Sequence, residues 1–392
     1  MKNGMTLLFE KRDLPIVSVS LAVKSGGVNE FPEEKGISHY IEHMLYKGTP
    51  TRNAKKIAEE IEKKGGELNG FTAEEITAYW CKMPSKHLKI ALEVLTDMVK
   101  NPLFDEKELE KERQVIFEEI KLYHDNPRMH VFDEVQKLMY DGTMNINLAG
   151  TFETMNTINR EKILNKFNQV YKTNNLILCV VGDADLKYLI EFAEKNFEKE
   201  KGKIPEQKFN LENSSKEESR GGIDQANLVF AYHTPLAKDE KSYAAIVLSA
   251  LTAEGMSSRL FSEIREKRNL AYSIKGSANI NKTFAYNLIY AGTQKENVNK
   301  VKKLILEEFE KVTKDLNEEE LNQVQEQLIG NYHISMEDSQ NHMVNLLATE
   351  IHGNAKEFYE FEEKIKKVKL KDVKELAEKV KGDYSFFALI PK

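Results

Sequence analysis

The sequence is poor in cysteine, proline and tryptophan, with two, nine and one of these residues among 392. Cys81 and Cys179 both lie in apolar, strand-like runs. Such surroundings are typical of small buried core residues. We therefore expect two free, buried thiols rather than a disulfide or a cysteine-based metal site.

Long apolar runs and an excess of positive charge are also absent. The longest apolar stretches, such as LILCVV at 176–181, have the length of strands and are far too short to span a membrane. The opening residues, MKNGMTLLFEKRD, lack the apolar region of a signal peptide. The formal net charge is −6, with Lys and Glu interleaved, so no basic surface for nucleic acid is indicated. We expect a cytoplasmic protein that binds neither membranes nor nucleic acid.

Two similar halves follow each other along the chain. Each half has alternating strand patterns, then an apolar helix, further strands and amphipathic helices, and each ends in a strand. The stretch NPLFDEKELEKERQVIFEEI of the first half is echoed by KDLNEEELNQVQEQLIGNY in the second. We predict an α+β fold with two homologous domains, residues 1–197 and 222–392, joined by a polar linker at 198–221. Each domain is expected to be a mostly antiparallel sheet packed with helices.

The stretch GISHYIEHML at 36–45 places two histidines and a glutamate in an otherwise apolar segment. The apolar residues recur at helical spacing, which predicts a buried helix. His39 and His43 then stand one turn apart on one face, with Glu42 beside them. Two imidazoles at this spacing can bind one zinc ion, and a glutamate next to them can act as a general base. The alternative is that both histidines are ordinary core residues.

The motif and its surroundings resemble the family of pitrilysin, insulin-degrading enzyme and mitochondrial processing peptidase, which are zinc peptidases with the inverted HxxEH motif. The resemblance covers essentially the whole chain. It includes HYIEHMLYKGT, KKGGELNGFT, ERQVIFEEIKLYHDNP and GMSSRLFSEIREKRNLAYS, in this order. It implies a zinc-dependent endopeptidase or oligopeptidase that encloses peptides or unfolded segments in a chamber. Each chain would form one half of a clamshell-shaped enclosure.

The resemblance also implies the remaining zinc site. The third ligand would be a glutamate on a later helix, and Glu119 fits. Its neighbour Glu118 is the competing choice, which we disfavour because adjacent helix positions point in different directions. Glu112, two turns before Glu119, would orient a ligand without binding the metal, or else be an ordinary exposed glutamate. When Gly48 and Gly255 are aligned, the second half carries no ligands, so one zinc ion per chain is expected.

Other residues enter through the same resemblance. Arg265 and Tyr272, seven positions apart in the second half, would reach the active site, the tyrosine to steady the tetrahedral intermediate and the arginine to hold substrate backbone. Without the family, a surface arginine and a core tyrosine would be the simpler interpretation. Asn69, Gly70 and Phe71 would lie on an edge strand to which an extended peptide adds, although an ordinary edge strand would show the same pattern.

The number of repeats bears on assembly and on the alternatives. The large members of the family have four repeats and this chain has two, so we expect a homodimer whose active sites combine residues from both subunits.

The main alternative to a zinc peptidase is a catalytically silent member of the family that acts as a scaffold or partner subunit, and a structural zinc protein is a third possibility. The seven other histidines have no partner at ligand spacing and are expected to be surface or packing residues.

Overall fold

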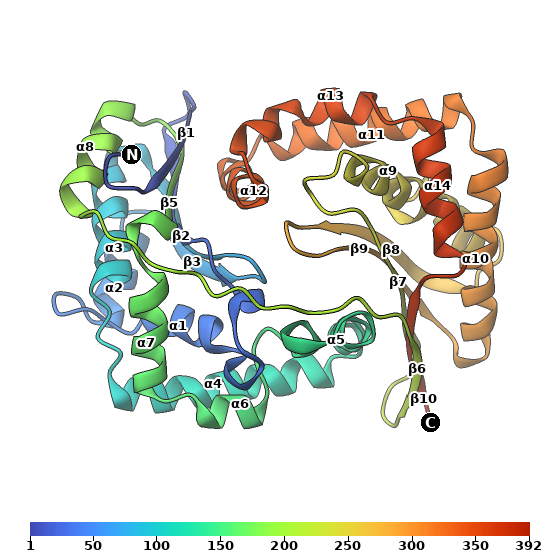
Figure 1. Ribbon diagram of the computed structural model, residues 1–392, viewed down its shortest axis with the longest axis horizontal. Coiled ribbons are helices and arrows are strands. Elements are labelled where there is room, and N and C mark those ends of the chain that lie inside the picture. Colours follow the sequence, from blue (N-terminus) through green and yellow to red (C-terminus); the bar gives the residue numbers. More distant parts are fainter. The chain divides into compact units, whose positions relative to one another are not determined.

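The computed structural model describes residues 1–392 and divides them into two compact units (Figure 1). Unit 1 comprises residues 1–121, 146–208 and 335–358. Unit 2 comprises residues 122–145, 209–334 and 359–392. Each unit is built on one five-stranded sheet. The predicted α+β class with two similar domains is confirmed.

The sheet of unit 1 has the strand order β1-β5-β2-β4-β3. Only β1 and β5 pair in parallel, and the other neighbours are antiparallel, as expected. Strand β3 lies at one edge, so one side of its backbone is free to pair with another strand. The five strands are Thr6–Lys11 (β1), Ile16–Val23 (β2), Glu67–Thr72 (β3), Thr77–Pro84 (β4) and Leu176–Gly182 (β5).

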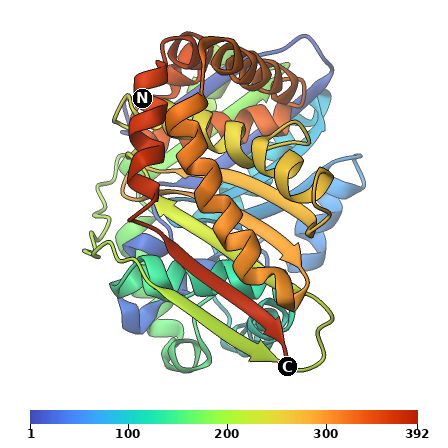
Figure 2. The same ribbon diagram turned by 90° about the vertical axis from the view of Figure 1, so that its right-hand side faces the viewer.

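The sheet of unit 2 repeats this topology with the order β6-β10-β7-β9-β8. Here β6 and β10 pair in parallel, and β8 takes the edge position that β3 has in unit 1. Figure 2 shows β10, in red, beside β6, in yellow-green. The strands are Ser215–Arg220 (β6), Ala226–His233 (β7), Ala271–Ile280 (β8), Ala285–Thr293 (β9) and Ser385–Pro391 (β10).

The helices cover the sheets and connect their strands. In unit 1 they include Ile37–Leu45 (α1), Ala54–Glu62 (α2), Leu88–Lys100 (α3), Arg160–Val170 (α7), Leu186–Asn196 (α8) and the short Phe152–Thr157 (α6). Within helix α4, Glu106–Asp125, the chain passes from unit 1 to unit 2 for the first time. Unit 2 contains Pro127–Met139 (α5), Ser242–Ala253 (α9), Val298–Asp315 (α10), Phe361–Lys366 (α13) and Leu370–Val380 (α14), and at the end of α11 (Glu318–Ser335) the chain returns to unit 1.

Each sheet is packed against a helix from the other half of the sequence. Helix α12, Ser339–His352, packs on β2 and β5 of unit 1, and α5 packs on β7 and β10 of unit 2. Strand β2 is therefore covered on both faces, by α3 on one side and α12 on the other, which explains why Val17–Val23 are all buried. The hydroxyls of Ser18 and Ser339, 2.9 Å apart, link β2 to α12.

The expected division into residues 1–197 and 222–392 differs from the observed units in two respects. The exchange of α5 and α12 makes both units discontinuous in sequence. The expected linker at 198–221 also contains strand β6, which pairs with β10. Its sequence, SKEESR, is polar because β6 is a mostly exposed edge strand held by backbone hydrogen bonds, so it lacks the apolar pattern of a buried strand.

Both cysteines are free and buried, as predicted. None of the helices combines the length and the apolar character that crossing a bilayer requires.

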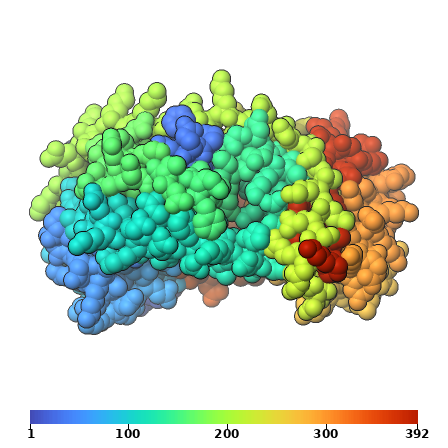
Figure 3. Space-filling model, turned by 90° about the horizontal axis from the view of Figure 1, so that it is seen from below, coloured from blue at the N-terminus to red at the C-terminus, as the bar shows by residue number.

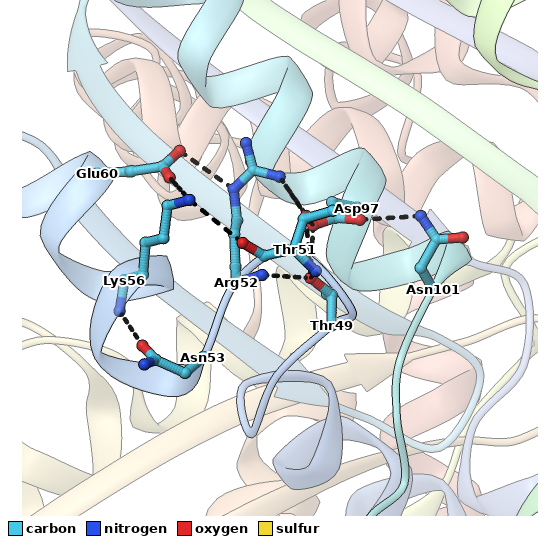
Figure 4. A network of polar contacts seen from close by, with 8 residues as sticks. All are labelled: Thr49, Thr51, Arg52, Asn53, Lys56, Glu60, Asp97 and Asn101. Carbon is cyan, nitrogen blue, oxygen red and sulfur yellow. Dashed lines mark hydrogen bonds and ion pairs between the residues drawn. The ribbon is translucent and has the colours of Figure 1, made fainter.

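Side chains of the loop after α1 donate hydrogen bonds to one buried carboxylate on α3, that of Asp97 (Figure 4). Its Oδ2 atom accepts from Thr49 at 2.6 Å, Thr51 at 2.7 Å and Arg52 at 2.8 Å, and its Oδ1 accepts from Asn101 at 2.8 Å. Burial acts to raise the pKa of Asp97, but these hydrogen bonds outweigh burial and lower it to about 2. The contacts fasten the end of α1 to α3.

Replacing this carboxylate should destabilise unit 1 in a pH-dependent way. Asp97→Asn should lower the free energy of unfolding by about 2 kcal/mol at pH 7, because an amide cannot accept all four hydrogen bonds and Arg52 loses one of the two carboxylates with which it pairs. Since the folded-state pKa lies below the ordinary value of 3.8, the contribution is complete above that value and is lost as pH falls towards about 2.

Urea unfolding of both proteins between pH 7 and pH 2 measures this difference. The exposed aspartate Asp224, replaced by asparagine, is the control and should behave like the wild type. Equal stability of Asp97→Asn and wild type at pH 7 would show that the carboxylate is dispensable.

Candidate metal centre and active site

Helix α1 is held in the core of unit 1 along one face and at its start. Its apolar residues are almost completely buried, as the sequence pattern predicts: Ile37, Tyr40, Ile41, Met44 and Leu45. Gly36 precedes the helix with a φ of +101°, a conformation that favours glycine. The buried carboxylate of Glu30 accepts hydrogen bonds from the backbone amides of Gly36 at 2.9 Å and Ser38 at 2.6 Å. It thereby caps the helix and complements its dipole.

The two histidines of α1 and a glutamate of α4 converge on one point. His39 Nε2 and His43 Nε2 lie 3.2 Å apart, and Glu119 Oε2 lies 3.6 Å from the first and 3.7 Å from the second. Three atoms with lone pairs therefore face one another. The structure brings together the three residues predicted to hold the metal.

The choice between Glu118 and Glu119 follows from the direction of their side chains on α4. Glu118 points away from the histidines, pairs with Lys121 at 2.7 Å and has a side chain that is 72% exposed. Figure 3 shows the surface to which the α4 stretch, in teal, contributes. Glu119 is the glutamate that reaches the histidines, at 33% exposure.

Glu112 lies beside His43 rather than on the surface. Its Oε2 atom lies 3.1 Å from His43 Nδ1, and its Oε1 atom pairs with Lys47 Nζ at 2.5 Å. The residue is buried, so an ordinary exposed glutamate is excluded. A hydrogen bond from Nδ1 to this carboxylate leaves His43 Nε2 with its lone pair free, which is the tautomer that a metal ligand requires.

The surroundings shift the pKa values of His39, His43 and Glu42 in different ways. Burial, with a contribution from His43, lowers the pKa of His39 to about 3, so its imidazole is neutral near pH 7. Burial acts in the same direction on His43, but the carboxylates of Glu112, Glu119 and Glu42 outweigh it and raise the pKa. Burial also raises the pKa of Glu42, and Glu119 adds to this, which makes Glu42 a stronger base than an exposed glutamate.

Glu42 lies between the two histidines in sequence and faces strand β3. Its Oε2 atom accepts a hydrogen bond from Thr72 Oγ1 at 2.9 Å. The sequence motif gives no indication of Thr72, because a threonine at the end of a strand is common. The pairing of β3 with β4 brings it to the carboxylate.

The predicted substrate-binding residues lie along β3 and point to alternate faces. Gly70 and Thr72 face α1, and a Cβ placed on Gly70 would lie 3.1 Å from Glu42 Oε1. Asn69 and Phe71 therefore face the other way. The exposed Asn69 accepts a hydrogen bond from the backbone amide of Gly70 at 2.8 Å, so its side chain bends along the edge of the strand. Substrate binding by these three residues stays a prediction.

Arg265 and Tyr272 belong to unit 2 and occupy unusual backbone. Arg265 lies in a π-helical segment, Phe261–Glu266, with its guanidinium 4.7 Å from the Phe261 ring centroid. π-Helical segments are rare in proteins, but where they occur they are often found at functional sites. Tyr272 is the extra residue of a bulge in edge strand β8 and is 78% exposed. It is therefore not a core tyrosine, and its functional role stays a prediction.

The helix of unit 2 that corresponds to α1 carries no metal ligands. Its residues Ile246, Ser249 and Ala250, which align with the three motif residues, all lie in α9. The Ser249 hydroxyl donates a hydrogen bond to Glu254 at 2.5 Å. This agrees with the expectation that only the first half binds metal.

A second cluster, which sequence reasoning missed, lies in unit 2. His130 and Glu134 stand one turn apart on α5, and Glu218 of β6 approaches His130 Nε2 at 3.0 Å. We had expected His130 to be a surface or packing residue without a partner at ligand spacing. The two carboxylates already pair with cations, Lys137 and Lys216 for Glu134 and Arg220 for Glu218. The cluster is therefore a buried ion-pair network.

Two family models match this chain in succession. Insulinase (peptidase family M16) matches residues 6–151, which contain His39, His43 and Glu119, and the peptidase M16 inactive domain matches residues 157–328. The chain belongs to peptidase family M16. This confirms the family resemblance. The second match also agrees with the lack of ligands in α9.

Several relatives are similar over most of their length. A protein of Rickettsia felis named an uncharacterized zinc protease is 33% identical over 347 residues, which is 86% of this chain and 83% of that protein. The uncharacterized zinc protease YmxG of Bacillus subtilis is 31% identical over 350 residues, 87% and 85% of the two chains. The crystal structure of a protease from Helicobacter pylori superimposes with a TM-score of 0.92 at 23% identity, covering 100% of this chain and 98% of that one. Family and names support a peptidase function.

Proposed function

We propose that this protein is a zinc-dependent endopeptidase or oligopeptidase in which Glu42 is the general base. The observation that carries the proposal is the convergence of His39 Nε2, His43 Nε2 and Glu119 Oε2 next to the half-buried carboxylate of Glu42. A catalytically silent scaffold would not need a glutamate with a raised pKa beside three converging ligand atoms.

The donor set fits zinc in kind and in size. Bonds of about 2.0–2.2 Å in a tetrahedral site place the ligand atoms about 3.3–3.6 Å from one another. The three observed separations, 3.2, 3.6 and 3.7 Å, fall inside this range or within about 0.1 Å of its limits. Three protein ligands leave one position open, as in catalytic rather than structural zinc sites.

The proposed reaction is the hydrolysis of a peptide bond. A zinc ion held by these ligands would polarise the attacking water and the scissile carbonyl. Glu42 accepts a proton from that water as the oxygen attacks the carbonyl carbon, and then gives the proton to the leaving amine nitrogen as the C–N bond breaks. Thr72 holds one oxygen of Glu42, so the carboxylate stays aimed during both transfers.

The substrate is proposed to bind as an additional strand on the free edge of β3, beside Asn69, Gly70 and Phe71. Recognition through the backbone depends little on the side chains of the substrate. We therefore propose peptides and unfolded segments as substrates, enclosed in a chamber. Only an extended chain exposes the backbone that such pairing needs.

We further propose that two copies of the chain form composite active sites. The metal residues belong to unit 1, and Arg265 and Tyr272 to unit 2. The bulge that turns Tyr272 outwards to 78% exposure supports a role towards another molecule. In a two-fold dimer the metal centre of one subunit would face Tyr272 of the other, giving two equivalent sites.

Metal and activity should depend on one site. The purified protein should contain about one zinc per chain, measured by elemental analysis. Glu42→Gln should abolish cleavage and retain zinc, whereas His43→Gln and Glu119→Gln should lose both. Glu112→Gln should weaken zinc affinity by about 10–100-fold, since it orients His43. Undiminished cleavage by Glu42→Gln would rule out the proposed base.

Substrates should be selected by folding state. Short unstructured peptides should be cleaved, and a stably folded protein should resist until it is unfolded, because its backbone is already paired. Mass spectrometry of one disulfide-stabilised substrate, before and after reduction, measures this with the same sequence. Efficient digestion of the native form would argue against an enclosed site.

Subunit mixing tests the composite site. Glu42→Gln and Tyr272→Ala should each be inactive, and random exchange between them should restore roughly a quarter of wild-type activity, because half of the dimers then hold one intact site of two. Subunit exchange is verified by mass spectrometry of isotope-labelled protein. Exchange without recovery would mean that Tyr272 acts within its own chain or has no catalytic role.

A further inference from the structure

The hydroxyl of Tyr46 is buried next to the proposed base and has no hydrogen-bond partner. Tyr46 is the residue that ends helix α1, one turn after Glu42. A buried hydroxyl without a partner is unfavourable, and such groups are rare in folded proteins. Its position therefore calls for a functional explanation.

Gly70 of β3 shows what the Tyr46 hydroxyl faces. A Cβ placed on Gly70 would lie 2.5 Å from Tyr46 Oη and 3.1 Å from Glu42 Oε1. The two oxygens therefore approach the same small space, which glycine leaves open. Any other residue at position 70 would push against the tyrosine hydroxyl. It would also meet the backbone oxygen of Ala78 at 2.9 Å.

The other phenols nearby are already paired. The Tyr79 ring lies 6.1 Å from that of Tyr46, but the Tyr79 hydroxyl lies 2.7 Å from the hydroxyl of Tyr171. These two groups satisfy each other. Glu42 is the carboxylate that faces the Tyr46 hydroxyl across Gly70, and its other oxygen is held by Thr72.

We propose that Tyr46 is a positioning residue for Glu42: its hydroxyl, unpaired in this structure, closes on Glu42 in the working enzyme and donates a hydrogen bond to Oε1, while Thr72 holds Oε2. Glycine is required at position 70 because a Cβ there would lie only 2.5 Å from the hydroxyl. The inference rests on the proposed function, since it assigns a role beside the general base. Two hydroxyls that hold two oxygens fix the plane of the carboxylate, as proton transfer in a defined direction requires.

The first test compares Tyr46→Phe with wild type on one peptide substrate. The variant should lower kcat about tenfold, the effect of one hydrogen bond to a charged group, and leave KM and zinc content unchanged. Tyr140→Phe is the matched control, because it also removes a buried, unpartnered hydroxyl, but in unit 2. It should retain the wild-type kcat. A kcat within twofold of wild type in Tyr46→Phe would overturn the inference.

The second test measures thermal stability, which reports on the contact between position 70 and Tyr46 independently of activity. Gly70→Ala should lower the melting temperature, and it should do so less in the Tyr46→Phe background, where the conflicting hydroxyl is absent. Equal shifts in both backgrounds would overturn the claim that the Tyr46 hydroxyl is what a Cβ at position 70 would meet. Failure of the wild type to cleave peptides would overturn the proposed function, whereas an active wild type with an unaffected Tyr46→Phe would overturn only the role of Tyr46.

Discussion

Two imidazoles on one helix must face the same point, and this requirement governs the structure around α1. One turn of helix separates His39 from His43, so both rings lie on one side only while the helix stays regular. The apolar face of α1 is buried in the core, and Glu30 caps its start. Asp97 fastens the loop after its end. Glu112 then fixes the ring of His43. The core thereby orients the proposed metal ligands.

The edge strand β3 adds a second constraint. The alternation of side chains along a strand turns Gly70 and Thr72 to the same face, and that face meets Glu42. The same strand leaves its outer edge free. One short strand thus contributes two features. Its inner face orients the proposed base, Glu42, and its free edge is suited to pairing with an extended peptide. A shift of its register by one residue would remove both Thr72 and Gly70 from the base.

Local patterns explain why much of this could be predicted from the sequence. The helical spacing of the histidines and apolar residues in α1 is a local property, and the structure confirms the helix. The family resemblance supplied Glu119, and the direction of side chains on α4 distinguishes it from Glu118. Strand β6 was missed because an exposed edge strand carries charged residues rather than an apolar alternation.

Long-range packing explains what the sequence did not reveal. The exchange of α5 and α12 depends on tertiary contacts that no local pattern encodes. Thr72 and Tyr46 lie 30 and 4 residues from Glu42, and only the pairing of β3 with β4 places Thr72 and Gly70 beside it. The ion-pair network joins His130 of α5 to Glu218 of β6, two residues that are 88 positions apart in the sequence.

The central claim is that one zinc ion is held by His39, His43 and Glu119. X-ray diffraction from crystals of the purified protein, recorded on both sides of the zinc absorption edge, tests it most directly. The account predicts one strong anomalous peak per chain, bounded by His39 Nε2, His43 Nε2 and Glu119 Oε2. A zinc peak only at the cluster of His130, Glu134 and Glu218, or zinc-containing protein without a peak at the α1 histidines, would contradict it.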